Sequence, residues 1–171
     1  VFTPFIQSEL HFRVDEIQKG TYTVDKREGQ TFGGLLKQAP PLIIEPVNRS
    51  NAIVVERIDA NEPIVWNVDA GDEEVYKRAL LDGVAHAQGT VMPGEKGNSY
   101  LFAHSVGNPW EIAQYNAVFY LLRELEKGDR VVIYRDGWRY DFRVYDKQIV
   151  EPTDVQFLTA DYPEPTLTLQ T

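Results

Sequence analysis

The 171-residue chain contains no cysteine and no run of basic residues. Each of these absences excludes particular kinds of site. Without cysteine, these residues form no disulfide and offer no thiolate ligand to a metal ion. With a formal net charge of -9 and no basic run, the chain lacks the kind of surface that binds nucleic-acid phosphates. No stretch reaches the roughly 18 consecutive apolar residues of a transmembrane helix. Nucleic-acid binding and a membrane-spanning helix are therefore not expected.

The common catalytic motifs are also missing. The sequence has no G-x-S-x-G elbow, no H-E-x-x-H pair and no glycine-rich phosphate loop. Ser105 follows His104, but neighbours on a strand point to opposite faces and do not form a Ser–His pair. The three histidines, His11, His86 and His104, share no spacing typical of metal ligands, so no metal site is expected. Acidic residues are abundant, and a solvated acidic surface is a simpler account of them than a glycosidase-type pair.

Short β-branched or alternating segments separated by turn signals predict a mostly β fold with one core. Asp136-Gly137, between two alternating segments, is typical of a two-residue hairpin turn. We expect a closed antiparallel barrel with two or three short peripheral helices. The expected strands are 52–58, 63–68, 98–104, 130–135, 138–150 and 166–171, and the expected helices are 72–82 and 115–126.

Residues 1–50 differ from the rest of the chain. Apolar residues between Ile6 and Ile17 recur at helical spacing, and a polar, glycine-bearing stretch then leads to Pro40-Pro41. We therefore expect an N-terminal appendage over 1–50, a helix plus a linker, and a barrel domain over 51–171. Because the sequence starts without an initiator methionine, one hypothesis is that a signal or membrane anchor preceded it.

One histidine lies at the end of an apolar strand. The turn signals Pro93-Gly94 and Gly97-Asn98 precede the apolar residues 100–103, and His104 follows them. A lone histidine in such a place is more often a hydrogen-bonded structural residue than a catalyst. Its interpretation therefore depends on the motifs around it.

Three separate stretches resemble the sortases. The run through residues 81–86 (LDGVAH), 93–98 (PGEKGN) and 103–105 (AHS) is similar to the segment that leads to the catalytic histidine of that family. Residues 152–155 (PTDV) and 168–171 (TLQT) are similar to a loop and to the strand that precedes the family's cysteine. The resemblance covers about residues 50–171, in the family's order.

This resemblance implies a sortase-like barrel and a cysteine transpeptidase at the extracellular face of the bacterial cell membrane. Such an enzyme cleaves a Leu-Pro-x-Thr-Gly-like sorting signal and joins the surface protein to an amine of a peptidoglycan precursor or a pilin lysine. The expected partners are therefore a signal peptide and an amine acceptor, with membrane contact only through a missing N-terminal anchor. No cofactor is expected, and calcium has no supporting motif in the sequence.

The resemblance also assigns roles to individual residues. His104 is the expected general acid and base. The expected substrate-binding residues are Ala103, Val155, Phe157, Leu158, Thr168, Gln170 and Thr171. His104 and Thr171 are therefore expected side by side at one end of the barrel. Thr168 and Gln170 are expected on the strand face opposite Leu169 and Thr171, and one of these two sets is expected to line an open groove beside an unpaired sheet edge.

Two departures from the family pattern qualify these expectations. Ala103 stands where the family usually has glycine before the histidine. The family's cysteine is expected directly after Thr171, with an arginine further on, and neither is among these residues, so the chain by itself is expected to be inactive. Two alternatives stay open: a non-catalytic peptide-binding β-barrel module, which the missing cysteine favours, and an acid–base hydrolase that uses carboxylates.

Overall fold

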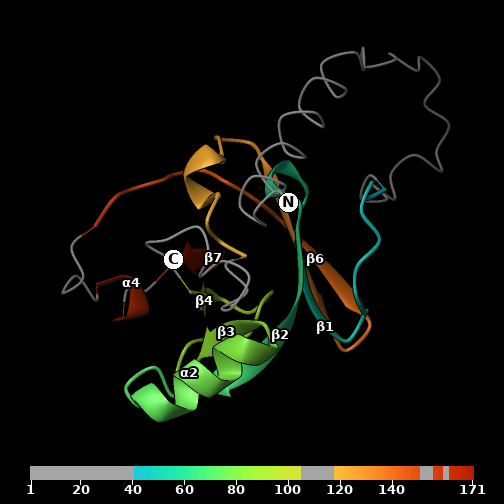
Figure 1. The fold of residues 1–171 in the computed structure, drawn as a ribbon. Helices are drawn as coiled ribbons and strands as arrows, with labels where there is room; N and C mark the ends of the chain where they lie inside the picture. Colours follow the sequence, from blue (N-terminus) through green and yellow to red (C-terminus); the bar gives the residue numbers. More distant parts are fainter. Residues whose placement is uncertain (1–40, 105–117, 151–155, 160–161) are drawn as a thin grey trace, which may run out of the picture.

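The computed structural model describes residues 41–104, 118–150, 156–159 and 162–171, and it is built mostly of β-strands. Seven strands form one sheet in the order β6-β5-β1-β2-β3-β4-β7, which curls into a nearly closed barrel (Figure 1). The strands are β1 (Asn51–Val55), β2 (Ala60–Val68), β3 (Val84–Ala87), β4 (Gly97–Phe102), β5 (Arg130–Arg135), β6 (Trp138–Arg143) and β7 (Pro165–Gln170). The helices are α2 (Glu73–Asp82), α4 (Gln156–Thr159) and the 3-10 turns η2 (Glu56–Ile58) and η3 (Leu122–Glu124). The predicted mostly β barrel is confirmed.

The strand pairing is mixed, which corrects the prediction of a wholly antiparallel barrel. Four neighbouring pairs are antiparallel, but β2 pairs with β3 and β4 pairs with β7 in parallel. Parallel neighbours need a crossover connection, and α2 supplies it between β2 and β3. Among the described strands no ladder joins β6 to β7, so the barrel is open along these two edges.

The crossover between β2 and β3 depends on Asp72 and Gly83. The Asp72 side chain caps α2 by accepting hydrogen bonds from Glu74 N at 3.0 Å and Val75 N at 3.2 Å. At the other end Gly83 has a φ of 152°, and a Cβ there would lie 2.3 Å from the carbonyl oxygen of Pro63. The predicted helix 72–82 is confirmed, and glycine at its end lets β3 lie directly against β2.

The β5–β6 hairpin forms as predicted, although its second strand is shorter. Asp136 and Gly137 have φ values of 52° and 82°, both left-handed, as a tight two-residue turn requires. Arg135 pairs with Trp138 across this turn. The second strand ends at Arg143 rather than at residue 150.

The predicted helix 115–126 is wrong over the residues that the structure describes. Of residues 115–126, the structure describes 118–126, and they form turns and η3 rather than an α-helix. Phe119, Leu121 and Leu125 are buried in the barrel core, so the apolar spacing reflects burial of a turn and not a helix face. The predicted helix near the N-terminus lies outside the described residues.

The core lies inside the barrel, and smaller apolar clusters cover its outer wall. Ile53, Leu101 and Ile133, from three different strands, are fully buried inside together with Phe119. Outside, α2 lies against β2 and β3 (Figure 1). Its Ala79 and Leu80 form a buried apolar cluster with Val68 of β2 and Ala85 of β3.

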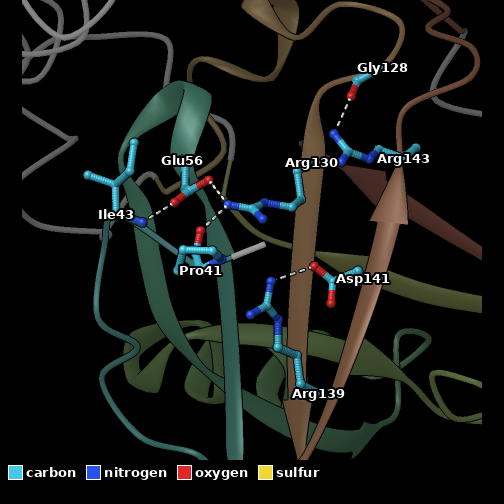
Figure 2. Close-up of polar contacts among 8 residues, drawn as sticks. All are labelled: Pro41, Ile43, Glu56, Gly128, Arg130, Arg139, Asp141 and Arg143. Carbon is cyan, nitrogen blue, oxygen red and sulfur yellow. Dashed lines mark hydrogen bonds and ion pairs between the residues drawn. The ribbon is translucent and has the colours of Figure 1, made fainter. Parts of the chain in front are cut away.

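Residues 41–50, here called the strap, lie along the outer wall beside β1 and β5. Leu42 and Ile44 of the strap pack against a buried cluster of Ala52, Val54, Val132 and Tyr134. Figure 2 shows its polar anchor: Arg130 Nη2 donates to Glu56 Oε2 at 2.6 Å and to the Pro41 carbonyl oxygen at 3.0 Å. The Ile43 amide donates to the other oxygen of Glu56 at 2.5 Å. The predicted boundary at residue 50 stays a prediction, since residues 1–40 lie outside the described part.

Candidate active site

The parallel β4–β7 pair brings His104 and Thr171 together. Phe102 lies opposite Gln170 in the ladder, and the next amide, Ala103 N, donates to the Gln170 carbonyl oxygen at 3.1 Å. Beyond the ladder, Thr171 Oγ1 donates to the His104 carbonyl oxygen at 3.3 Å. The predicted contact between these residues, 67 positions apart in sequence, is confirmed.

The two faces of β7 serve different purposes, as predicted from their alternation. Leu167 and Leu169 pack against the barrel core. On the opposite face, Thr168 Oγ1 donates to Asn98 Oδ1 at 2.9 Å, and Gln170 Oε1 accepts from the Tyr100 hydroxyl at 2.8 Å. A row of polar side chains therefore lies along the outer face of β4 and β7, in which Asn98 and Tyr100 are buried, Thr168 is partly buried and Gln170 is exposed.

His104 is partly buried, and its environment favours the neutral imidazole. Burial lowers the pKa of His104 below its ordinary value, and the positive charge of Lys77 on α2 lowers that pKa further. Lys77 is itself paired with Glu73 one helical turn earlier. The imidazole is therefore neutral at pH 7, so it is able to accept a proton.

His86, the other described histidine, has a structural environment. Its ring is 1% exposed and lies edge-on to Trp66, with 5.4 Å between ring centroids. Nδ1 accepts from the Asn67 amide at 3.4 Å, which leaves the proton on Nε2, 3.1 Å from both the Val91 carbonyl oxygen and Thr90 Oγ1. This side chain ties β2 to the loop after β3 and has no surface open to a substrate.

The other predicted substrate-binding residues differ in where they lie and in how exposed they are. Phe157 and Leu158 lie on α4, partly buried, and α4 contacts β4. Ala103 is buried and packs with the barrel core, so its side chain does not reach the outer face. Val155 lies outside the described residues.

Asn98 is a site residue that the sequence did not reveal. Its side chain donates to the Phe157 carbonyl oxygen at 2.6 Å and accepts from Thr168, so it joins α4 to the β4–β7 pair. In the sequence Asn98 belonged to a turn signal, to the expected strand 98–104 and to the stretch 93–98 that resembles the sortases. None of these patterns indicates a contact with Phe157, which lies 59 positions away. In the described part of the chain, no cluster of three His, Cys, Asp or Glu residues is placed to hold a metal ion.

Comparison with known proteins agrees with this arrangement of strands and site. The sequence profile of the family described as "Sortase domain" matches residues 53–171. The chain belongs to the sortase family. This match includes β4 and β7, the strands that place His104 beside Thr171.

Individual sortases are distant relatives. The chain is 27% identical over 122 residues to Sortase D of Bacillus subtilis (strain 168), covering 71% of this chain and 53% of that protein. It therefore spans about half the length of this curated relative. Among solved structures, sortase C-1 of Actinomyces oris is similar with a TM-score of 0.57 and 25% identity, over 72% of this chain and 64% of that one.

A third comparison concerns the fold alone. The Sortase D5 transpeptidase of Clostridium perfringens superposes with a TM-score of 0.57 at 20% identity, over 95% of this chain and 88% of that one. None of the helices in the described ranges combines the length and apolar character needed to cross a membrane.

Proposed function

We propose that the protein represented by these residues is a cysteine transpeptidase that cleaves a Leu-Pro-x-Thr-Gly-like sorting signal. Membership of the sortase family supports this activity. The observation that carries it is the contact between Thr171 and His104. A residue following Thr171 has its Cα only about 3.8 Å further on, so a cysteine there would lie beside His104.

His104 handles the protons in this mechanism. The neutral imidazole accepts the thiol proton, and the thiolate attacks the carbonyl carbon of the signal's Thr. The Thr–Gly peptide bond breaks, the Gly nitrogen leaves with a proton from the imidazolium, and a thioester remains. An acceptor amine then attacks the thioester, the imidazole takes the amine's proton, and the cysteine sulfur is released.

Substrate binding follows the outer face of β4 and β7. In this proposal Thr168, Gln170 and Thr171 border the signal peptide beside the reacting bond. The apolar part of the signal lies against Val155, Phe157 and Leu158, and Ala103 supports the strand beneath. The acceptor is an amine of a peptidoglycan precursor or a pilin lysine, and the enzyme works at the extracellular face of the bacterial membrane, where it anchors proteins to the cell wall.

Mutation of His104 tests the catalytic assignment. In the protein extended by a cysteine after Thr171 and the strand that follows it, His104→Ala should lower kcat/KM for a quenched fluorescent Leu-Pro-Ala-Thr-Gly peptide by at least a factor of about 100 to 10,000. The matched control is His86→Gln, which leaves the site untouched and should stay close to the wild-type rate. An essential His86 with a dispensable His104 would reverse the assignment.

A second candidate function is a non-catalytic module that binds the same peptide in the same place. It needs no cysteine, and the same strands β4 and β7 would hold the peptide. Both functions predict that the 171-residue chain binds the peptide. They differ once the cysteine is present, because only the transpeptidase then forms a thioester and cleaves the peptide.

A further inference from the structure

Asn98 is a buried polar residue at the centre of the candidate site, and the proposed reaction gives it no role. Its side chain belongs to β4, and the residue is 5% exposed. Nδ2 donates to the Phe157 carbonyl oxygen at 2.6 Å, and Oδ1 accepts from Thr168 Oγ1 at 2.9 Å. Three segments that are far apart in sequence, β4, β7 and α4, therefore meet at one amide group.

The chemistry of the neighbours fixes which way this amide points. The Phe157 carbonyl can only accept, so it must face the NH₂ group of Asn98. The reverse orientation would place two acceptor oxygens 2.6 Å apart. The Thr168 hydroxyl can donate, and it does so to the carbonyl end of Asn98. Both ends of the side chain are thus satisfied, in one orientation only.

The backbone of Asn98 is held as firmly as its side chain. Asn98 pairs with Thr166 in the β4–β7 ladder, and its carbonyl oxygen accepts from the Val91 amide at 3.3 Å. By contrast, α4 is a single turn of four residues, too short to be stable as a helix by itself. A rigid strand therefore holds a short helix through a buried hydrogen bond.

We propose that Asn98 is the positioning residue for the signal-binding surface: it fixes α4 so that Phe157 and Leu158 are already in place beside β4 and β7 when the peptide arrives. This inference rests on the proposed function. Asn98 touches no reacting atom, so it acts on binding rather than on bond breaking. A preformed surface binds better because little ordering is left to be done on association.

The first test uses the 171-residue chain and replaces the amide with an apolar side chain of similar size. In Asn98→Leu the carbonyl of Phe157 loses its donor, so hydrogen exchange at the amides of 156–159 should accelerate about two- to tenfold. Affinity for a fluorescein-labelled Leu-Pro-Ala-Thr-Gly peptide, measured by fluorescence anisotropy, should fall by a similar factor. Exchange in β1 and β5 serves to check that the barrel remains folded.

A second variant keeps the side chain's shape and makes its effect depend on pH. In Asn98→Asp the carboxyl still accepts from Thr168, but only its protonated form can donate to Phe157. The ratio of variant to wild-type exchange at 156–159 should therefore be high at pH 7 and fall as the pH is lowered toward 4. A purely structural loss of packing would not produce this profile.

Ser99→Ala is the matched control, since Ser99 is the next residue on β4. Its hydroxyl is buried and has no hydrogen-bond partner within the described part of the chain, so both exchange and affinity should match the wild type.

The role proposed for Asn98 is overturned if both Asn98 variants show unchanged exchange at 156–159 or unchanged peptide affinity. A wild-type chain that does not bind the peptide overturns the proposed function instead, and the exchange data then show separately whether Asn98 holds α4.

Discussion

At the scale of single residues, His86 makes stability depend on pH. Burial lowers the pKa of His86 below its ordinary value, because the charged imidazolium is poorly solvated inside the protein. The nearby Arg135 lowers this pKa further, whereas the Val91 carbonyl and Glu95 raise it. Below about pH 6.5 the unfolded chain therefore binds more protons than the folded one, and the free energy of unfolding falls as pH decreases.

This sign gives a measurable prediction for urea unfolding between pH 5 and 7.5. Wild-type stability should decline toward pH 5, and His86→Gln, though less stable at pH 7, should show a shallower decline. His104 has a lowered pKa as well, so His104→Gln is the control and should remove a smaller part of the slope, because its ring is more exposed. An equal slope in wild type and His86→Gln would contradict the prediction.

At the scale of elements, the ion pair between Arg130 and Glu56 anchors the start of the strap. The side chains of Arg130 and Glu56 are only 11% and 12% exposed, so removing one charge deprives the other, nearly buried charge of this ion pair (Figure 2). Arg130→Met should therefore lower the free energy of unfolding by about 2–4 kcal/mol. It should also release the strap, which limited proteolysis within residues 41–50 would detect.

Two further variants isolate the contribution of charge. Adding Glu56→Gln to Arg130→Met should recover part of the lost stability, because the buried charge is then gone. Lys77→Met breaks the exposed pair with Glu73 and should leave the unfolding midpoint unchanged within error. Equal effects of Arg130→Met and Lys77→Met would show that the strap pair contributes no more than a surface one.

The predictability of each element follows from how local its cause is. The hairpin at Asp136 and Gly137 was predictable because its turn chemistry lies in two adjacent residues. The four-residue strand β3 and its parallel pairing were not, since they depend on the α2 crossover and on Gly83 lying against Pro63. The apolar spacing around Phe119 indicated a helix because burial in a barrel core and burial of a helix face leave the same pattern.

The contacts of the candidate site also differ in how far the sequence predicted them. The proximity of His104 and Thr171 was predicted only through the family resemblance, because no local pattern links residues so far apart. The hydrogen bond between Asn98 and Phe157 was not predicted, since it joins β4 to a helix 59 positions later in the sequence. Contacts of this kind depend on the completed barrel.

At the scale of the whole molecule, stability is expected to be uneven across the barrel. β1 lies between β5 and β2, and four of its five residues are buried. Among the described strands β7 pairs only with β4, at the edge of the sheet, and its side chains are partly buried or exposed. Opening β7 therefore breaks one ladder and exposes only the partly buried Leu167 and Leu169, whereas opening β1 disrupts the fully buried core.

Native-state hydrogen exchange of the 171-residue chain should resolve this difference. Amides in β1 and β5 should exchange only through global unfolding, while those of β7 should exchange through a local opening at least about 2 kcal/mol lower, or roughly thirtyfold faster. Peptide binding along β4 and β7 should raise the protection of β7 toward that of β1. Equal protection of β7 and β1 without peptide would contradict the prediction and would mean that the edge carrying Thr171 is as rigid as the core that supports His104.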